Sequence, residues 1–306
     1  KSLTCEDNIM IKLIATDMDG TLFNSNQEIS PLNIAAIKQA EKQNVEFMIA
    51  TGRSMDTIGN IVKEYQLNCS FLLMNGAEIR DKDKNIINTI NIEQDTILRL
   101  TDVLEQMGYT PEFMTDQGAQ ICSTQERMEY NMGCRMLCLD RTHTLTLEQA
   151  IEQGKNSVFM KTLTRNDTLQ DMFDRNVEVR KMIVFGFDLE KNAKNRAILT
   201  EQFPELAISY SYPDNIEINA RLAQKGNGLM QAIENMGISK EEVAVFGDGL
   251  NDLSMFELFP NSFAPANAEY EIKKLAKEVI PSNNDDGVGK KIFELLYKNK
   301  EEEAGR

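Results

Sequence analysis

The sequence predicts an α/β fold built on a doubly wound parallel sheet, interrupted by an inserted α+β segment. Within residues 1–83, short apolar runs alternate with amphipathic stretches in the order strand, helix, strand, helix, strand. This order is typical of a parallel sheet with right-handed crossovers. Residues 84–218 are more polar and less regular, and the alternation resumes over residues 219–306. We therefore expect one core domain in two parts, 1–83 and 219–306, and an inserted domain over 84–218.

The core elements follow from apolar runs and from helix boundary signals. Mostly apolar runs of four to six residues indicate buried strands of a parallel sheet. Ser30 and Pro31 are a capping residue and a favoured first helical residue, and Gly237 is a typical helix terminator. The expected strands cover residues 11–15, 45–50, 71–74 and 242–246, and the expected helices cover residues 31–43, 54–65 and 227–236.

The insert mixes strand-like runs with amphipathic helices, which indicates an α+β domain. Helical spacing of apolar residues is clear in two of its segments. The strands expected here cover residues 86–92, 157–163, 181–187, 207–212 and 216–219, and the clearest helices cover residues 93–107 and 189–203.

Composition excludes several classes of partner. A net charge of −15 argues against nucleic acid or an acidic membrane surface as the main partner. No run of eighteen apolar residues is present, and the first residues lack the apolar segment of a signal peptide. Five sparse cysteines without paired spacing fit a reducing compartment, so we expect a cytoplasmic protein. The sequence sets no expectation for the oligomeric state.

Two other kinds of site are disfavoured by residue content. His143 is the only histidine, and it lies in a polar segment, so a Ser-His-Asp or Cys-His mechanism has little support. Cys134 and Cys138 are one helical turn apart, but no third cysteine or histidine lies nearby to complete a metal site.

Polar residues cluster where the predicted core strands end. Asp17 and Asp19 follow the first strand, Thr51-Gly52-Arg53 follows the second, and Asp248 through Asp252 follows the strand over 242–246. The fourth segment, Lys225-Gly226, precedes a helix. Because parallel strands end at one edge of the sheet, we expect these segments to meet in one cleft.

The expected cluster is rich in carboxylates and needs cations. Asp17, Asp19, Asp248 and Asp252 would repel one another and raise one another's pKa values. Oxygen ligands favour a hard divalent cation, so Mg²⁺ is the expected cofactor, and Lys225 adds a second positive charge. Carboxylates, Mg²⁺, a lysine and the Thr51 hydroxyl suit phosphoryl transfer through an aspartyl phosphate.

These four segments resemble the signature motifs of the haloacid dehalogenase superfamily. The motifs are Asp17-Met18-Asp19-Gly20-Thr21, Thr51-Gly52-Arg53, Lys225-Gly226 and Gly247-Asp248-Gly249-Leu250-Asn251-Asp252. Within that superfamily the chain is similar to the Cof-type branch, whose class IIB α+β cap matches the insert in place and size. The supporting pieces are Asn75-Gly76-Ala77, Asn267-Ala268 and Asp286-Gly287-Val288.

The resemblance implies a role for each motif residue. Asp17 would be the nucleophile, and Asp19 would protonate the leaving oxygen and then activate water. Thr51 and Lys225 would hold phosphate oxygens, while Mg²⁺ would bind Asp17, a backbone carbonyl at Asp19, and Asp248. The expected pocket residues around the phosphate are Gly52, Arg53, Asn75 and Asn251, and Asn251 and Asp252 would orient the lysine and the metal ligands.

The expected function is a Mg²⁺-dependent phosphatase that acts on a small phosphorylated metabolite, with sugar phosphates as the expected class. The cap would shield the intermediate from water and contact the leaving group. Two alternatives stay open at this point. One is a hexose phosphate phosphomutase, and the other is a sugar-phosphate sensor without catalysis.

Overall fold

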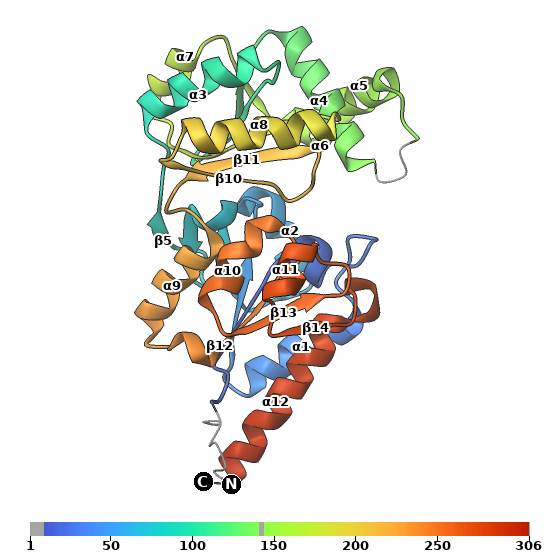
Figure 1. Ribbon diagram of the computed structural model, residues 1–306, viewed down its shortest axis with the longest axis vertical. Coiled ribbons are helices and arrows are strands. Elements are labelled where there is room, and N and C mark those ends of the chain that lie inside the picture. The colour runs from blue at the N-terminus through green and yellow to red at the C-terminus, as the bar shows by residue number, and fades with distance from the viewer. Residues whose placement is uncertain (1–8, 141–143, 306) are drawn as a thin grey trace. The chain divides into compact units, whose positions relative to one another are not determined.

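The computed structural model describes residues 9–140 and 144–305, and the chain forms two compact units with a sheet in each (Figure 1). The core unit comprises the chain up to Asn88 together with the chain from Gln224 onward. The insert unit is Thr89–Ala223. The divisions at 88/89 and 223/224 lie a short way after the predicted boundaries at 83/84 and 218/219.

The core unit has the predicted α/β fold. Its eight-stranded sheet has the order β14-β13-β12-β1-β2-β3-β4-β5. β1 pairs in parallel with both β2 and β12. The sheet therefore extends from β1 to β2 and β3 on one side and to β12 and β13 on the other, and ligands usually bind at such a switch point. The strands are β1 Leu13–Thr16, β2 Glu46–Ala50, β3 Ser70–Leu73, β4 Glu78–Arg80, β5 Ile86–Thr89, β12 Val243–Phe246, β13 Asn261–Pro265 and β14 Glu278–Ile280.

Helices cover both faces of this sheet. Alternate residues of β1, such as Leu13 and Ala15, pack with α9, α10 and α11 in one apolar cluster. α1 packs against α12, and Lys291 of α12 lies over the Phe263 ring of β13. The helices are α1 Pro31–Lys42, α2 Met55–Glu64, α9 Lys225–Met236, α10 Leu253–Leu258, α11 Tyr270–Leu275 and α12 Gly287–Gly305.

The residues predicted to begin and end helices do so in the structure. The Ser30 hydroxyl accepts a hydrogen bond from the Asn33 N–H at 3.1 Å, with Pro31 as the first helical residue. Gly237 ends α9 in the left-handed region at φ 66°. Short helical turns lie at Met18–Leu22, Met74–Gly76, Lys240–Glu242, Leu250–Asp252 and Asn283–Asp285.

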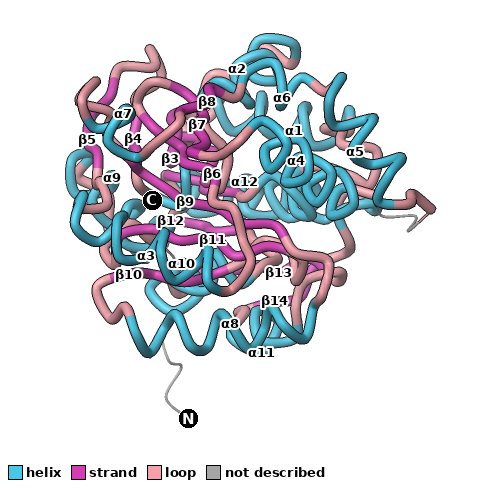
Figure 2. Tube along the Cα trace, turned by 90° about the horizontal axis from the view of Figure 1, so that it is seen from above, coloured by secondary structure: helices cyan, strands magenta, loops and turns pink. Residues whose placement is uncertain are grey.

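The insert unit is a second sheet with helices on both faces. Its strand order is β10-β11-β9-β6-β7-β8. α3, α7 and α8 contribute to one apolar cluster. α4 contacts α5, α5 contacts α6, and the three helices lie near one another in both views (Figures 1 and 2). The elements are α3 Gln94–Gln106, β6 Glu112–Thr115, β7 Gly118–Cys122, α4 Gln125–Leu139, α5 Leu147–Asn156, α6 Val158–Thr162, β8 Thr164–Asn166, α7 Leu169–Phe173, β9 Val179–Phe185, α8 Leu189–Gln202, β10 Leu206–Ser209 and β11 Asn215–Ala220.

The strand predicted over residues 157–163 is wrong, because this segment forms helix α6. Ser157 caps the helix by accepting a hydrogen bond from the Met160 N–H at 3.1 Å. The Thr162 hydroxyl donates back to the Val158 carbonyl at 3.0 Å. A short apolar run does not distinguish a strand from a turn of helix, and the capping serine decided the outcome here.

Cys69, Cys122 and Cys134 are free thiols in the structure. Burial raises the pKa of Cys69 to about 12, so this thiol is protonated at neutral pH. His143 lies outside the described residues. None of the helices in the described ranges has the length and apolar character required to cross a membrane.

Candidate active site

The site begins at the carboxyl end of β1, where the backbone makes a tight turn. The Asp17 N–H donates to the Phe246 carbonyl at 2.9 Å, which ties the segment to β12. Asp19 and Gly20 have φ/ψ of −75/116° and 80/−5°, the angles of a type II turn. A Cβ atom on Gly20 would also lie 2.3 Å from Oδ2 of Asp248. Glycine is therefore required here both by the backbone angle and by the nearby carboxylate.

A buried lysine joins two of the predicted carboxylates. Lys225 is fully buried at the start of α9, and its Nζ donates to Oδ1 of Asp17 at 2.7 Å and to Oδ1 of Asp252 at 2.6 Å. Oδ2 of Asp252 accepts the N–H groups of Asp248 at 2.9 Å and Gly249 at 3.0 Å. Asp252 thus uses both oxygens to fix the lysine and the loop that carries Asp248.

Gly226 explains how α9 brings the lysine so close. Its N–H donates to the Ser254 hydroxyl at 2.9 Å, and a Cβ atom on Gly226 would lie 2.3 Å from the Ser254 carbonyl oxygen. Only glycine allows α9 to approach this backbone, so the Lys-Gly pair serves as one positional unit.

The donor set fits a hard divalent cation. Asp17, Asp248 and Asp252 offer carboxylate oxygens that all lie within 4.8 Å of one another. Asp252 has both oxygens engaged, whereas Oδ2 of Asp17 and Oδ2 of Asp248 have no hydrogen-bond partner within residues 9–140 and 144–305. Oδ1 of Asp248 accepts the Thr21 hydroxyl at 2.6 Å. Two adjacent carboxylate oxygens without protein partners are suitable ligands for a cation such as Mg²⁺.

The electrostatics of the cluster support the same reading. Burial raises the pKa of Asp17 to about 7, against the lowering effect of Lys225 and with further repulsion from Asp252 and Asp19. Burial, together with repulsion from Asp17 and Asp252, raises the pKa of Asp248 well above its usual range. Burial alone would lower the pKa of Lys225, but Asp17 and Asp252 raise it overall, so the lysine is charged. The cluster lacks positive charge, and a bound cation would supply it.

Thr51 and Arg53 lie at the end of β2. Thr51 is buried, and its hydroxyl accepts the Arg53 N–H at 3.2 Å. The Arg53 guanidinium binds the Asp19 carboxylate through both Nε, at 2.7 Å, and Nη2. Nη2 also donates to Oε1 of Gln27 at 2.9 Å, and the guanidinium lies 5.5 Å from the Phe23 ring centre. The Arg53 guanidinium therefore binds Asp19, the predicted acid/base residue.

Asn75 and Asn251 join two further strand ends. Nδ2 of Asn251 donates to Oδ1 of Asn75 at 3.3 Å, which links the loop after β12 to the turn after β3. The Asn75 N–H donates to the Thr51 carbonyl at 3.1 Å, so this turn is also tied to the end of β2. Gly52 lies in the bend between Thr51 and Arg53.

The core unit thus contains every predicted site residue. Direct contacts link Asp17, Lys225, Asp252 and Asp248 into one group, pair Asp19 with Arg53 and pair Asn75 with Asn251. Sequence reasoning gave no role to Thr21, Ser254 or Gln27. Thr21 lies inside a quoted motif and Ser254 lies two residues beyond another, whereas Gln27 carries no sequence signal.

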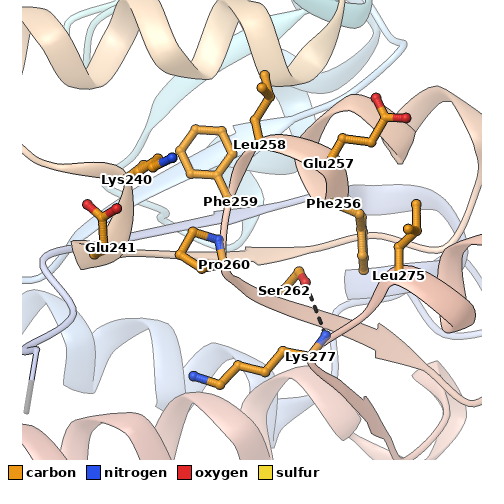
Figure 3. A pocket seen from close by; sticks show the side chains of 10 residues that line it. All are labelled: Lys240, Glu241, Phe256, Glu257, Leu258, Phe259, Pro260, Ser262, Leu275 and Lys277. Atoms are coloured by element: carbon orange, nitrogen blue, oxygen red, sulfur yellow. Dashed lines mark hydrogen bonds between the residues drawn. The ribbon is translucent and has the colours of Figure 1, made fainter. Parts of the chain in front are cut away.

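A separate pocket of about 620 Å³ lies at the amino ends of the core strands, away from the carboxyl ends that carry the site (Figure 3). Its lining includes Lys240 and Pro260, which precede β12 and β13, and Lys277, which precedes β14. The site residues follow the carboxyl ends of the strands, whereas this pocket lies at the amino ends. Apolar side chains such as Phe256 and Phe259 line most of the rest, so it offers no chemistry comparable to the carboxylate cluster.

Comparison with known proteins identifies the family. A model of the haloacid dehalogenase-like hydrolases matches residues 14–292. The chain belongs to the haloacid dehalogenase-like hydrolases. The superfamily predicted from four short motifs is therefore confirmed, and so is the prediction of a hydrolytic enzyme.

Curated relatives of this hydrolase match it over nearly its whole length. The 5-amino-6-(5-phospho-D-ribitylamino)uracil phosphatase YcsE of Bacillus subtilis (strain 168) is 28% identical over 288 residues, which cover 94% of this chain and 96% of the relative. Phosphatase YwpJ of the same organism is 28% identical over 291 residues, which cover 94% of this chain and 100% of the relative.

Solved structures share its fold. A haloacid dehalogenase-like hydrolase from B. subtilis superposes with a TM-score of 0.78 at 25% identity, covering 92% of this chain and 99% of that one. The HAD subclass IIB sugar phosphatase BT4131 superposes with a TM-score of 0.71 at 22% identity, covering 93% and 99%. The second likeness establishes the fold alone.

Proposed function

We propose that this hydrolase is a Mg²⁺-dependent phosphatase that removes phosphate from a small phosphorylated metabolite through an aspartyl-phosphate intermediate. The observation that carries the proposal is the fully buried Lys225, which bridges Asp17 and Asp252 beside the Asp248 carboxylate. Relatives of equal length are named phosphatases, which supports the same activity.

In the first step, Oδ2 of Asp17 attacks phosphorus while Oδ1 stays bound to Lys225. An O–P bond to Asp17 forms, the P–O bond to the substrate alcohol breaks, and the leaving oxygen takes a proton from Asp19. The side chain of Asp17 keeps 7% of its surface exposed, at the carboxyl end of β1. Lys225 balances the charge that develops on the phosphoryl oxygens.

In the second step, water attacks phosphorus and Asp19 accepts its proton. The bond to Asp17 breaks, which releases inorganic phosphate, restores the Asp17 carboxylate and leaves Asp19 in the protonated form with which the cycle began. The bidentate contact of Arg53 fixes the orientation of the Asp19 side chain for these proton transfers. Arg53 and the buried Thr51 hydroxyl also place donors beside the expected phosphate position.

The proposed Mg²⁺ ligands are Oδ2 of Asp248, the backbone carbonyl of Asp19 and the Asp17 carboxylate, whose Oδ1 would bind the cation beside Lys225 so that Oδ2 is left to attack phosphorus. When bound, the cation supplies positive charge to the carboxylate cluster and to the phosphate oxygens. Asp252 is assigned to positioning, because both of its oxygens are already engaged.

The proposed substrate class is phosphorylated sugars and sugar alcohols, because one relative is named for a phosphoribityl substrate. The cytoplasm is the proposed compartment, since free thiols such as Cys69 and Cys134 persist in reducing conditions. The cap role of the insert unit stays a prediction.

The test is hydrolysis of p-nitrophenyl phosphate, with the wild type compared with Asp17→Asn. We expect activity that needs Mg²⁺, stops with EDTA and is lost in Asp17→Asn. Asp56→Asn is the matched control, because Asp56 is exposed in the first turn of α2. Trapping the enzyme in acid should yield one phosphoryl group on the peptide that contains Asp17. Hydrolysis that persists in Asp17→Asn would contradict the proposal, and a bisphosphate-dependent isomerisation of hexose phosphates would indicate a mutase instead.

A further inference from the structure

We propose that three asparagine side chains clamp the segment that carries Asp19, and that Asn267 is the positioning residue among them. The inference rests on the proposed function and extends it to residues outside the signature motifs. Three backbone carbonyls after β1 each accept a hydrogen bond from an asparagine side-chain amide. The bonds are Asn267 Nδ2 to Gly20 O at 2.8 Å, Asn33 Nδ2 to Leu22 O at 3.1 Å and Asn283 Nδ2 to Phe23 O at 2.8 Å.

The segment needs such support because it lies outside the sheet. It contains the type II turn at Asp19 and Gly20 and a wide turn in which the Phe23 N–H donates to the Met18 carbonyl at 2.8 Å. It carries the proposed acid/base carboxylate and the Thr21 hydroxyl that binds Asp248. A catalytic group on a loop keeps its geometry only when neighbouring residues hold the backbone.

Each asparagine comes from a different element and is itself held. Oδ1 of Asn267 accepts the Asn283 N–H at 3.0 Å. Oδ1 of Asn33, in α1, accepts the N–H of Gly289 in the first turn of α12 at 2.8 Å. The amide orientations of Asn267 and Asn33 follow from these bonds, because in each of the two the oxygen meets an N–H and the nitrogen meets a carbonyl.

Asn267 also belongs to a turn that contacts the second catalytic loop. Two residues later, the Glu269 N–H donates to the Asp248 carbonyl at 2.9 Å. The turn after β13 therefore holds the backbone of Gly20 on one side and the backbone of Asp248 on the other. This connection fixes the loop of the acid/base residue relative to the loop of a proposed metal ligand.

Burial separates the roles of the three asparagines. Asn33 is 1% exposed and Asn283 is 8% exposed, so their loss would leave buried polar groups and weaken the fold. Asn267 is exposed, so water can replace its bond to Gly20 at little cost in stability. Water does not fix the carbonyl in one position, and we therefore expect the loss of Asn267 to affect catalysis more than folding.

The experiment compares Asn267→Asp and Asn267→Ala with Asn284→Ala in p-nitrophenyl phosphate hydrolysis and thermal unfolding. Asn267→Asp keeps the shape and the acceptor for the Asn283 N–H but loses the donor to Gly20. We expect kcat to fall about 10- to 100-fold in both Asn267 variants, because small displacements of catalytic groups have effects of this size. KM should change less than about twofold, and the unfolding temperature should stay within a few degrees of the wild type.

Asn284→Ala is the matched control, because Asn284 neighbours Asn283 but its side chain accepts hydrogen bonds from Ser25 in the exposed turn. It should keep the wild-type kcat. A wild-type kcat in Asn267→Asp would overturn the clamp, since that variant lacks the donor to Gly20 and sets a carboxylate against the Gly20 carbonyl. Parallel losses of kcat and unfolding temperature in Asn267→Ala would also overturn it, because they would indicate a structural role. A wild type with no Mg²⁺-dependent hydrolysis would instead defeat the proposed function, so the two failures are distinguishable.

Discussion

The metal-free protein should lose stability as the pH rises from about 4 to about 7, because of Asp17. Its pKa is raised from 3.8 to about 7 in the folded protein, chiefly by burial. Between these values the unfolded chain has released this proton while the folded chain still holds it. The folded state therefore binds more protons, and the free energy of unfolding falls as the pH rises.

The size of the effect follows from the shift. A difference of about 3 pKa units at about 1.4 kcal/mol each gives about 4 kcal/mol as an upper estimate, with most of it lost by pH 7. Asp248 contributes with the same sign, since its pKa is also raised. Mg²⁺ should reverse the loss above pH 7, because the cation binds the ionised carboxylates.

The assay is urea unfolding in EDTA at several pH values, for the wild type and for Asp17→Asn. The difference between the two curves reports Asp17 together with its effect on Asp248, because the titrating groups outside the cluster are common to both proteins. We expect the wild type to lose stability relative to the variant by a few kcal/mol between pH 4 and pH 7. A difference that is flat or of opposite sign over this range would refute the reasoning about burial and charge.

Two further predictions concern packing and the insert unit. Gly226→Ala should cost about 1–3 kcal/mol and most of the activity, because the new Cβ meets the Ser254 carbonyl oxygen at 2.3 Å. Gly59→Ala in α2 has open space and should be slightly stabilising, so urea midpoints that fall equally would contradict the argument. Glu112→Gln should cost about 3 kcal/mol, because it removes the buried partner of Arg135 at 2.6 Å. The exposed pair of Arg99 and Glu205 is the control, and Glu205→Gln should change the free energy of unfolding by less than about 1 kcal/mol.

The core of this fold was predictable because its strands are buried on both faces. The apolar runs at β1, β2 and β3 alternate with helical segments, which favoured strands, and Ser30 with Pro31 marked the start of the first helix to the residue. In the insert the same reasoning was weaker. Residues 157–163 are apolar enough for a strand, yet a single capping serine made them helical. Local hydrogen bonds of this kind compete with hydrophobic pattern and are hard to weigh from sequence.

The site was predictable to the level of which residues meet, since parallel strand ends converge. What the sequence did not reveal is how the side chains divide their contacts. Arg53 was expected beside the phosphate, and it binds the Asp19 carboxylate with help from Gln27. Of the asparagine contacts to Gly20, Leu22 and Phe23, the first and the last join residues more than two hundred positions apart in the sequence. No local sequence pattern indicates such contacts.

Hydrogen bonding, rather than distance, separates the roles of the three clustered carboxylates. Asp17, Asp248 and Asp252 offer oxygens that all lie within 4.8 Å of one another, so proximity alone would make all three metal ligands. Asp252 has both oxygens engaged by Lys225 and two backbone N–H groups, while Asp17 and Asp248 each keep one oxygen without a partner among the residues that the structure describes. One acid is therefore committed to orienting the lysine and two are left for a cation and a phosphoryl group. The proposed chemistry needs this division. Asp17 would bind Lys225 and phosphorus, and a metal ion would neutralise the negative charge that remains in the cluster.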